Sequence, residues 1–202
     1  MTIVEERPQA GGEAAARKAM IDSQLRTSGV NAQFALSRMG AVAREAIVPT
    51  GEHGTASHDR AIPLGNGRYL AAPVVQGLML QEARPSAADK ALLVDGGSGY
   101  LAELLRPLVG SLEVLAPADA VAAPPANGDF TLLMIDGAIE QLPGALVGRL
   151  AEGARVVGGI VRNGLSRLAI GRKAAGEVGL LPLAEVGIPV LPEFAARKGW
   201  SF

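Results

Sequence analysis

The sequence has no cysteine, few aromatic residues, almost no net charge and no long apolar run. Without cysteine there is no disulfide and no thiolate metal site, and only two histidines could supply an imidazole to a metal. A formal charge of −1 gives no broad basic field that would attract nucleic acid or an anionic membrane. No apolar run approaches the roughly 18 residues of a membrane span, and the first residues are acidic where a signal peptide is basic. We therefore expect a cytoplasmic protein that uses no metal and binds neither nucleic acid nor membrane.

Small aliphatic residues are abundant instead. Hydrophobic residues make up 49% of the 202 residues, aromatic residues only 3%, and there are 26 glycines. This composition is typical of α/β domains with short turns. A chain of this length can bury one sizeable core, so we expect a single domain over residues 1–202, and the oligomeric state stays open.

The most informative stretch is ALLVDGGSGYLA, residues 91–102. A short apolar run leads directly into Gly96, Gly97 and Gly99, and a helical pattern follows at once. This order predicts a buried parallel strand, a tight turn and a helix. Glycines leave backbone N–H groups accessible beside a helix N-terminus, so the turn is a candidate site for a nucleotide-like cofactor. The alternative is a turn whose glycines serve packing only.

The N-terminal part is expected to form a helical cap. Residues 1–12 show no apolar period and are predicted to be a flexible tail, followed by a helix from near Glu13 and by a second helix. Residues 47–75 contain too many prolines and glycines for a long helix, and loops of that length tend to carry function. Residues 13–73 are therefore assigned to the cap and a substrate loop, and residues 74–202 to the α/β core.

The second half of the chain predicts a mostly parallel sheet with helices on both faces. The expected elements are helices over 75–83, 101–110 and 140–153, and strands over 92–94, 111–117, 129–138, 154–161, 166–173 and near 181–191. Residues 119–128 contain two adjacent prolines and cannot hold the helix and strand that a doubly wound sheet places there. The sheet is therefore expected to lack one helix–strand unit.

Five segments between residue 20 and about residue 157 match motifs of one known family, in the same order: MIDSQLRTSGV, AREAIVP, DRAIPLGNGRYLAAP, LLVDGGSGYLAELL and IEQLPGALVGRLAEGARVV. They resemble the protein-L-isoaspartate O-methyltransferase family, which uses S-adenosylmethionine to methylate isoaspartyl carboxylates in damaged proteins. The resemblance implies a Rossmann-like methyltransferase fold, S-adenosylmethionine as cofactor, and a protein or peptide as substrate or partner. The shortened middle is similar to the compact bacterial branch of the family.

The resemblance also implies a set of cofactor-binding residues. The loop matches the family's cofactor loop with Asp95, Gly96, Gly97, Gly99 and Tyr100. Asp136 ends a predicted strand at the carboxyl edge of the sheet, where ligands of open α/β folds bind, so it is expected to contact the same ligand; a helix cap is the alternative.

The sequence departs from the family at three binding positions. Ala71 stands where the family has a serine that orients the substrate carboxylate. Aligned on GSGY, Leu93 takes the place of the acid before the loop, although a shifted alignment lets Asp95 serve as that acid. Leu115 matches the acid that holds the ribose hydroxyls, and Asp119 lies too far along the chain. No catalytic residue of the family is then intact, so we expect S-adenosylmethionine to bind weakly or not at all and methyl transfer to be weak or absent.

Other interpretations stay open. The chain could be a non-catalytic scaffold that binds a protein or peptide surface. GSGYLA also matches the dinucleotide fingerprint with Asp119 as the ribose acid, although prolines lie next to Asp119. His53 and His58 could pair on a metal but lack a third ligand, so solvated loop histidines are expected. Arg44 and Glu45 are expected to be solvated charges.

Overall fold

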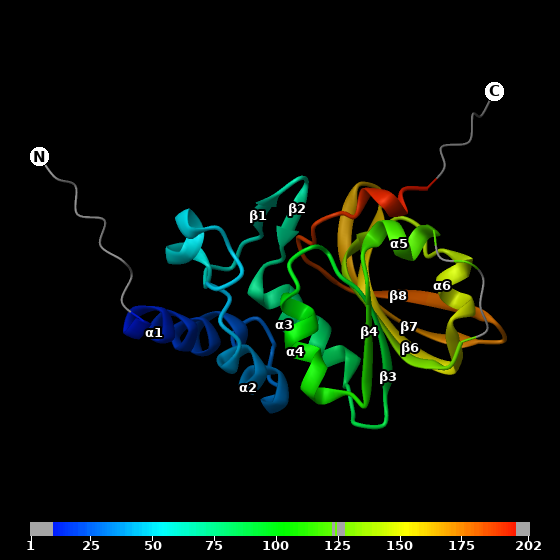
Figure 1. The fold of residues 1–202 in the computed structure, drawn as a ribbon, viewed down its shortest axis with the longest axis horizontal. Coiled ribbons are helices and arrows are strands. Elements are labelled where there is room, and N and C mark those ends of the chain that lie inside the picture. Colours follow the sequence, from blue (N-terminus) through cyan, green and yellow to red (C-terminus); the bar gives the residue numbers. More distant parts are fainter. Residues whose placement is uncertain (1–9, 123, 125–127, 197–202) are drawn as a thin grey trace, which may run out of the picture.

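A computed structural model describes residues 10–122, 124 and 128–196 (Figure 1). The N-terminal part forms the predicted helical cap: α1 spans Ala10–Met20, a π-helical segment spans Ile21–Leu25 and α2 spans Gln33–Ala41. The first helix begins at Ala10 rather than near Glu13, so the end of the predicted tail is helical, and residues 1–9 lie outside the described part. No helix in the described part is both long and apolar enough to cross a bilayer.

The centre of the molecule is a six-stranded sheet with the order β4-β3-β5-β6-β7-β8. Its first four strands are parallel, and β7 and β8 are added in antiparallel pairing. The strands are β3 Lys90–Val94, β4 Ser111–Leu115, β5 Phe130–Ile139, β6 Leu150–Arg162, β7 Leu165–Ala174 and β8 Glu177–Glu185. The mostly parallel sheet predicted from the strand–helix alternation is confirmed.

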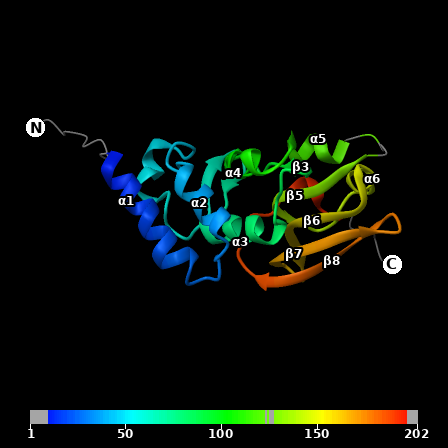
Figure 2. The same ribbon diagram turned by 90° about the horizontal axis from the view of Figure 1, so that it is seen from below.

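Both faces of the parallel strands are covered, as a continuous apolar run such as KALLV in β3 predicts. On one face, α3 (Pro73–Ala83), α4 (Tyr100–Leu105) and the cap pack against side chains such as Leu93. On the other face, α5 (Pro117–Ala122) and α6 (Gly144–Gly148) pack against side chains such as Leu92. The cap helices α1 and α2 lie at the end of the molecule away from β8 (Figure 2).

The segment 186–194 contributes to both of these cores. Ile188 belongs to the core on the cap face, whereas Leu191 and Phe194 belong to the core on the opposite face. Backbone hydrogen bonds fix the segment along β5: the Ala138 N–H donates to the Pro189 carbonyl at 2.8 Å, and the Leu191 N–H donates to the Ala138 carbonyl at 2.9 Å.

The run 47–75, predicted to be a loop, contains regular structure. It includes a 3₁₀ helix, Thr50–Thr55, and a hairpin made of β1 (Ile62–Gly65) and β2 (Arg68–Leu70). The hairpin turns at Asn66 and Gly67, which both have positive φ (53° and 71°). An Asn-Gly pair between two short strands favours this turn, so the hairpin had a signal in the sequence.

Of two further predicted features, the shortened connection between β4 and β5 is present, whereas the helix over 140–153 is shorter than predicted. Between β4 and β5 the chain forms only the short helix α5, and no strand occurs among the described residues of this gap, as expected for a missing helix–strand unit. The helix predicted over 140–153 is reduced to α6, Gly144–Gly148, because β6 already begins at Leu150, which pairs with Phe130 of β5. Sheet pairing therefore overrides the helical pattern over residues 150–153.

Candidate functional site

The glycine loop joins β3 to α4, as the sequence predicts, and each glycine has a local reason. Gly97 and Gly99 have positive φ (108° and 70°), a backbone region that other residues rarely adopt. At Gly96 a Cβ atom would collide with the backbone carbonyl oxygen of Asp136. The loop therefore needs its glycines for its own conformation and for its contact with β5.

Asp95 holds the loop from within. Its carboxylate accepts hydrogen bonds from the backbone N–H groups of Gly97 (2.9 Å) and Gly99 (3.0 Å). Two donors that the sequence suggested for a cofactor therefore bind a carboxylate of the chain itself. Leu93, in the place of the family acid, is fully buried in the core on the cap face and cannot take part in this site.

On the side where a side chain would project, Gly97 lies against a side chain of the hairpin. A Cβ atom at Gly97 would lie 2.9 Å from Cγ of Arg68 in β2. The Arg68 guanidinium forms an ion pair with Glu193, with a second contact of 3.3 Å between Nη1 of Arg68 and Oε2 of Glu193, and this hydrogen bonding lowers the pKa of Glu193. The hairpin and the segment 186–194 therefore meet over the loop. Sequence reasoning found neither residue, because the partners are far apart in the chain.

Asp136 lies directly beside the loop. It sits at a bulge in β5, where the pairing with β6 shifts, and β5 continues beyond it to Ile139. Its side chain is buried and accepts hydrogen bonds from Gln76 Nε2, at 3.2 Å to both carboxylate oxygens, and from Ser98 Oγ at 3.4 Å. Burial, with a smaller effect from the charge of Asp95, raises the pKa of Asp136 to about 7. The site therefore contains a carboxyl group that changes its charge near neutral pH.

Arg44 and Glu45 are buried, so the expectation that they are solvated is wrong. Arg44 is fully buried; its Nε donates to the Ala56 carbonyl at 2.9 Å and its Nη1 donates to Gln76 Oε1 at 2.7 Å. Glu45 forms an ion pair with Arg17 of α1. The resemblance of AREAIVP to a family motif was the available signal for a structural role of these charges.

Gln76 connects Arg44 to Asp136, so one buried polar network extends from the cap to the glycine loop. The same guanidinium lies 4.8 Å from the centre of the Tyr100 ring. Tyr100 is completely buried and its hydroxyl has no partner among the described residues. Ala71 is also buried, and it contributes only its carbonyl, which accepts from Arg44 Nη2 at 2.8 Å.

The remaining candidate residues lie apart from this network. Leu115, at the end of β4, is partly buried, and Asp119 is exposed in the first turn of α5. His53 Nδ1 lies 3.8 Å from Glu13 Oε1 of the cap. Among the described residues no group of three or more His, Asp or Glu side chains is arranged to hold a metal ion.

Comparisons with known proteins agree with the resemblance. The family model described as "Protein-L-isoaspartate(D-aspartate) O-methyltransferase (PCMT)" matches residues 15–116. The protein-L-isoaspartate O-methyltransferase of Koribacter versatilis is 30% identical in an alignment 195 positions long, which covers 85% of this chain and 88% of the relative. That of Aeropyrum pernix is 31% identical in an alignment 217 positions long, which covers 92% of this chain and 83% of the relative.

A solved structure has the same fold. It is the crystal structure of a putative protein-L-isoaspartate O-methyltransferase from Plasmodium falciparum in complex with S-adenosyl-L-homocysteine, with a TM-score of 0.72 and 17% identity over 88% of this chain and 98% of that chain. The predicted family resemblance and the Rossmann-like methyltransferase fold are thus confirmed. The chain belongs to the protein-L-isoaspartate O-methyltransferase family.

Proposed function

We propose that this chain is a family member in which methyl transfer from S-adenosylmethionine to isoaspartyl carboxylates is weak or absent. The observation that carries the proposal is the contact of Arg68 with the open side of Gly97, where Arg68 is held by its ion pair with Glu193. A cofactor that approaches the loop from this side must displace Arg68. The N–H groups of Gly97 and Gly99 already donate to Asp95, and the side chains around the loop fit S-adenosylmethionine poorly.

The chemistry of the reaction explains why these side chains matter. An isoaspartyl carboxylate, with a pKa of about 4, is ionised at neutral pH, so the reaction needs positioning rather than a general base. Ala71 offers no hydroxyl to orient that carboxylate, and Leu115 offers no carboxylate to ribose hydroxyls. Hydrogen bonds to charged groups contribute roughly 1.5–3 kcal/mol each, so two such losses reduce the rate by about two to four powers of ten.

A non-catalytic scaffold that binds a peptide is the second candidate. A hollow of about 330 Å³ lies between the hairpin and the segment 186–194, and it is lined by Tyr69 and Val190, among others. Both side chains are well exposed, at 42% and 48%. Exposed apolar side chains around a hollow favour contact with a peptide. The family acts on protein substrates, so a peptide is the natural occupant of this hollow.

Calorimetric titration of S-adenosylmethionine and S-adenosylhomocysteine into the purified protein tests the proposal. Thermal unfolding with and without cofactor gives a second measure. A ligand at a hundred times its Kd would stabilise the fold by roughly 2.7 kcal/mol, and we expect a far smaller stabilisation at millimolar cofactor. The variant Glu193→Gln releases Arg68 and should bind the cofactor more tightly than the wild type. The variant Arg106→Gln, on the exposed surface, is the matched control.

A radiolabelled-methyl assay on an isoaspartyl peptide completes the test. We expect little transfer by the wild type and more by Ala71→Ser, which restores the hydroxyl. Tight cofactor binding together with rapid transfer by the wild type would show that the proposal is wrong. Binding of the peptide without transfer, measured by fluorescence anisotropy, would favour the scaffold.

A further inference from the structure

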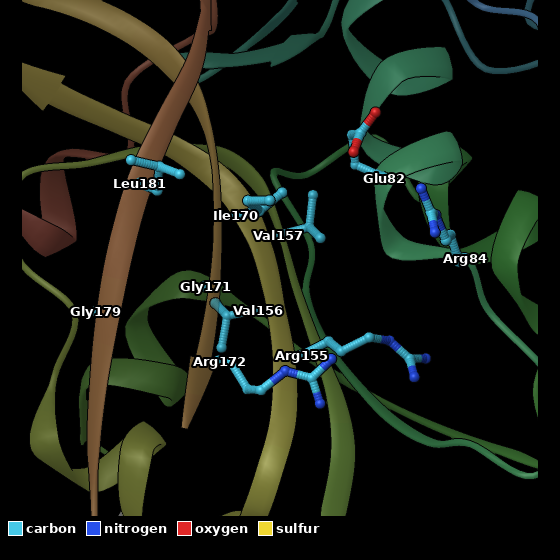
Figure 3. Close-up of a pocket in the computed structure, with 10 residues that line it drawn as sticks. All are labelled: Glu82, Arg84, Arg155, Val156, Val157, Ile170, Gly171, Arg172, Gly179 and Leu181. Atoms are coloured by element: carbon cyan, nitrogen blue, oxygen red, sulfur yellow. The ribbon is translucent and has the colours of Figure 1, made fainter. Parts of the chain in front are cut away.

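A second cavity lies far from the glycine loop, on the cap face of strands β6, β7 and β8. It has a volume of about 450 Å³ and is bordered by the end of α3 (Figure 3). This size falls within the range of small-molecule sites, roughly 300–1,000 Å³. We call it the arginine cavity, because Arg84, Arg155 and Arg172 all line it.

Two of these arginines are placed side by side by the register of the sheet. Arg155 of β6 pairs directly with Arg172 of β7. Like charges directly opposite each other on neighbouring antiparallel strands are unfavourable. Arg155 forms an ion pair of 2.6 Å with Asp89 and donates to the Ala83 carbonyl at 3.1 Å, whereas Arg172 donates to the neutral Gly153 carbonyl at 3.0 Å. An anion between the two guanidinium groups would remove this repulsion.

The third arginine lies at the rim. Arg84 follows the last residue of α3 and has a left-handed backbone (φ 45°, ψ 55°), a conformation that glycine usually takes at a helix C-terminus. Glu82 is the acidic side chain that lines the cavity with the three arginines, so the charge of these four residues together stays positive.

An apolar row lies next to the arginine pair. Val157, Ile170 and Leu181 are paired across the three strands, on the same face as the arginine pair and next to it along the strands, and Leu181 is 62% exposed. Gly179, which pairs with Arg172, leaves open space on this face of β8: a Cβ atom there would meet nothing within 4 Å. No packing contact of the described residues therefore demands a glycine at this position.

We propose that the arginine cavity binds a small carboxylate that carries an aliphatic body. The carboxylate accepts charge-assisted hydrogen bonds from Arg172 and from the N–H groups of Arg155 that Ala83 and Asp89 leave available. The aliphatic body covers Ile170 and Leu181, next to Val157, which is itself almost fully buried. Each half of the cavity alone would suit many molecules, but a charged pair beside an apolar row fits a ligand that has both parts.

Calorimetric titration of octanoate into the full chain tests this site, with octan-1-ol and inorganic phosphate as the comparison probes. We expect octanoate to bind and both comparison probes to bind at least tenfold more weakly, because each lacks one of the two parts. Arg172→Gln should weaken octanoate binding roughly tenfold to a hundredfold through the loss of a charge-assisted hydrogen bond. Arg155 is left unchanged, because its removal would leave the buried Asp89 without its charged partner.

Gly179→Val separates binding from folding. Valine suits a strand and would project into the cavity, so this variant should keep or raise the melting temperature while it abolishes octanoate binding. Arg106→Gln, at an exposed residue that does not line the cavity, should bind octanoate as the wild type does. The proposal is overturned if the wild type does not bind octanoate, if octan-1-ol or phosphate binds equally well, or if folded Arg172→Gln and Gly179→Val proteins retain full affinity.

Discussion

Replacement of Asp136 by asparagine should stabilise the protein at high pH. The carboxyl group is buried, and its pKa rises from the usual 3.8 to about 7. Between these two values the folded protein binds a proton that the unfolded chain releases, so the stability falls as pH rises through this window and is constant above it. At about 1.4 kcal/mol per pKa step, the ionised carboxylate destabilises the fold by on the order of 4 kcal/mol above pH 7.

The asparagine side chain has nearly the same shape as the carboxyl group and can still accept from Gln76, but it carries no charge. We therefore expect Asp136→Asn to gain about 2–4 kcal/mol over the wild type at pH 8 and much less at pH 4. Urea denaturation of both proteins at several pH values measures the difference. Asp119→Asn is the control, because Asp119 is exposed and its replacement should leave the slope between pH 4 and 7 unchanged. Wild type and Asp136→Asn with parallel pH profiles would refute the reasoning.

Three other substitutions have definite expected outcomes. Gly97→Ala should destabilise the fold by about 1 kcal/mol or more in thermal unfolding, because of its positive φ and its contact with Arg68; an unchanged melting temperature would contradict this. Arg44→Met should cost about 3–5 kcal/mol in urea unfolding, because buried acceptors at Ala56, Ala71 and Gln76 lose their donor; a loss below 1 kcal/mol would count against the network. Arg84→Gly should gain about 0.5–1 kcal/mol by relief of left-handed backbone strain, measured by the same method, and a loss would show that the arginine side chain stabilises the fold.

The sequence was sufficient for the parts of the fold that local patterns determine. The apolar run before the glycines predicted β3, and the glycines predicted the turn because a backbone with positive φ excludes most other residues. The two prolines after Asp119 predicted the shortened connection between β4 and β5. Asp95 could be placed at the loop because it directly precedes the glycines.

The parts that sequence reasoning missed depend on contacts between distant segments. Arg44 looks like any surface charge in the sequence, and its burial depends on Gln76 and on backbone carbonyls that only the folded chain brings together. The pairing of Arg68 with Glu193 spans most of the chain. The shortening of α6 has the same origin, because residues 150–153 join β6 when β5 is present as a pairing partner.

The position of segment 186–194 has a consequence for biosynthesis. The ribosome synthesises the chain at about 5–20 residues per second and makes this segment after every strand of the sheet. Until it emerges, Ile188 is absent from one core and Leu191 and Phe194 from the other, so a nascent chain exposes apolar surface on both faces of its sheet. Products that stop before residue 186 also lack the partner of Arg68. Chaperones and proteases would therefore recognise such a truncated product by its exposed apolar surface, and proteases would degrade it.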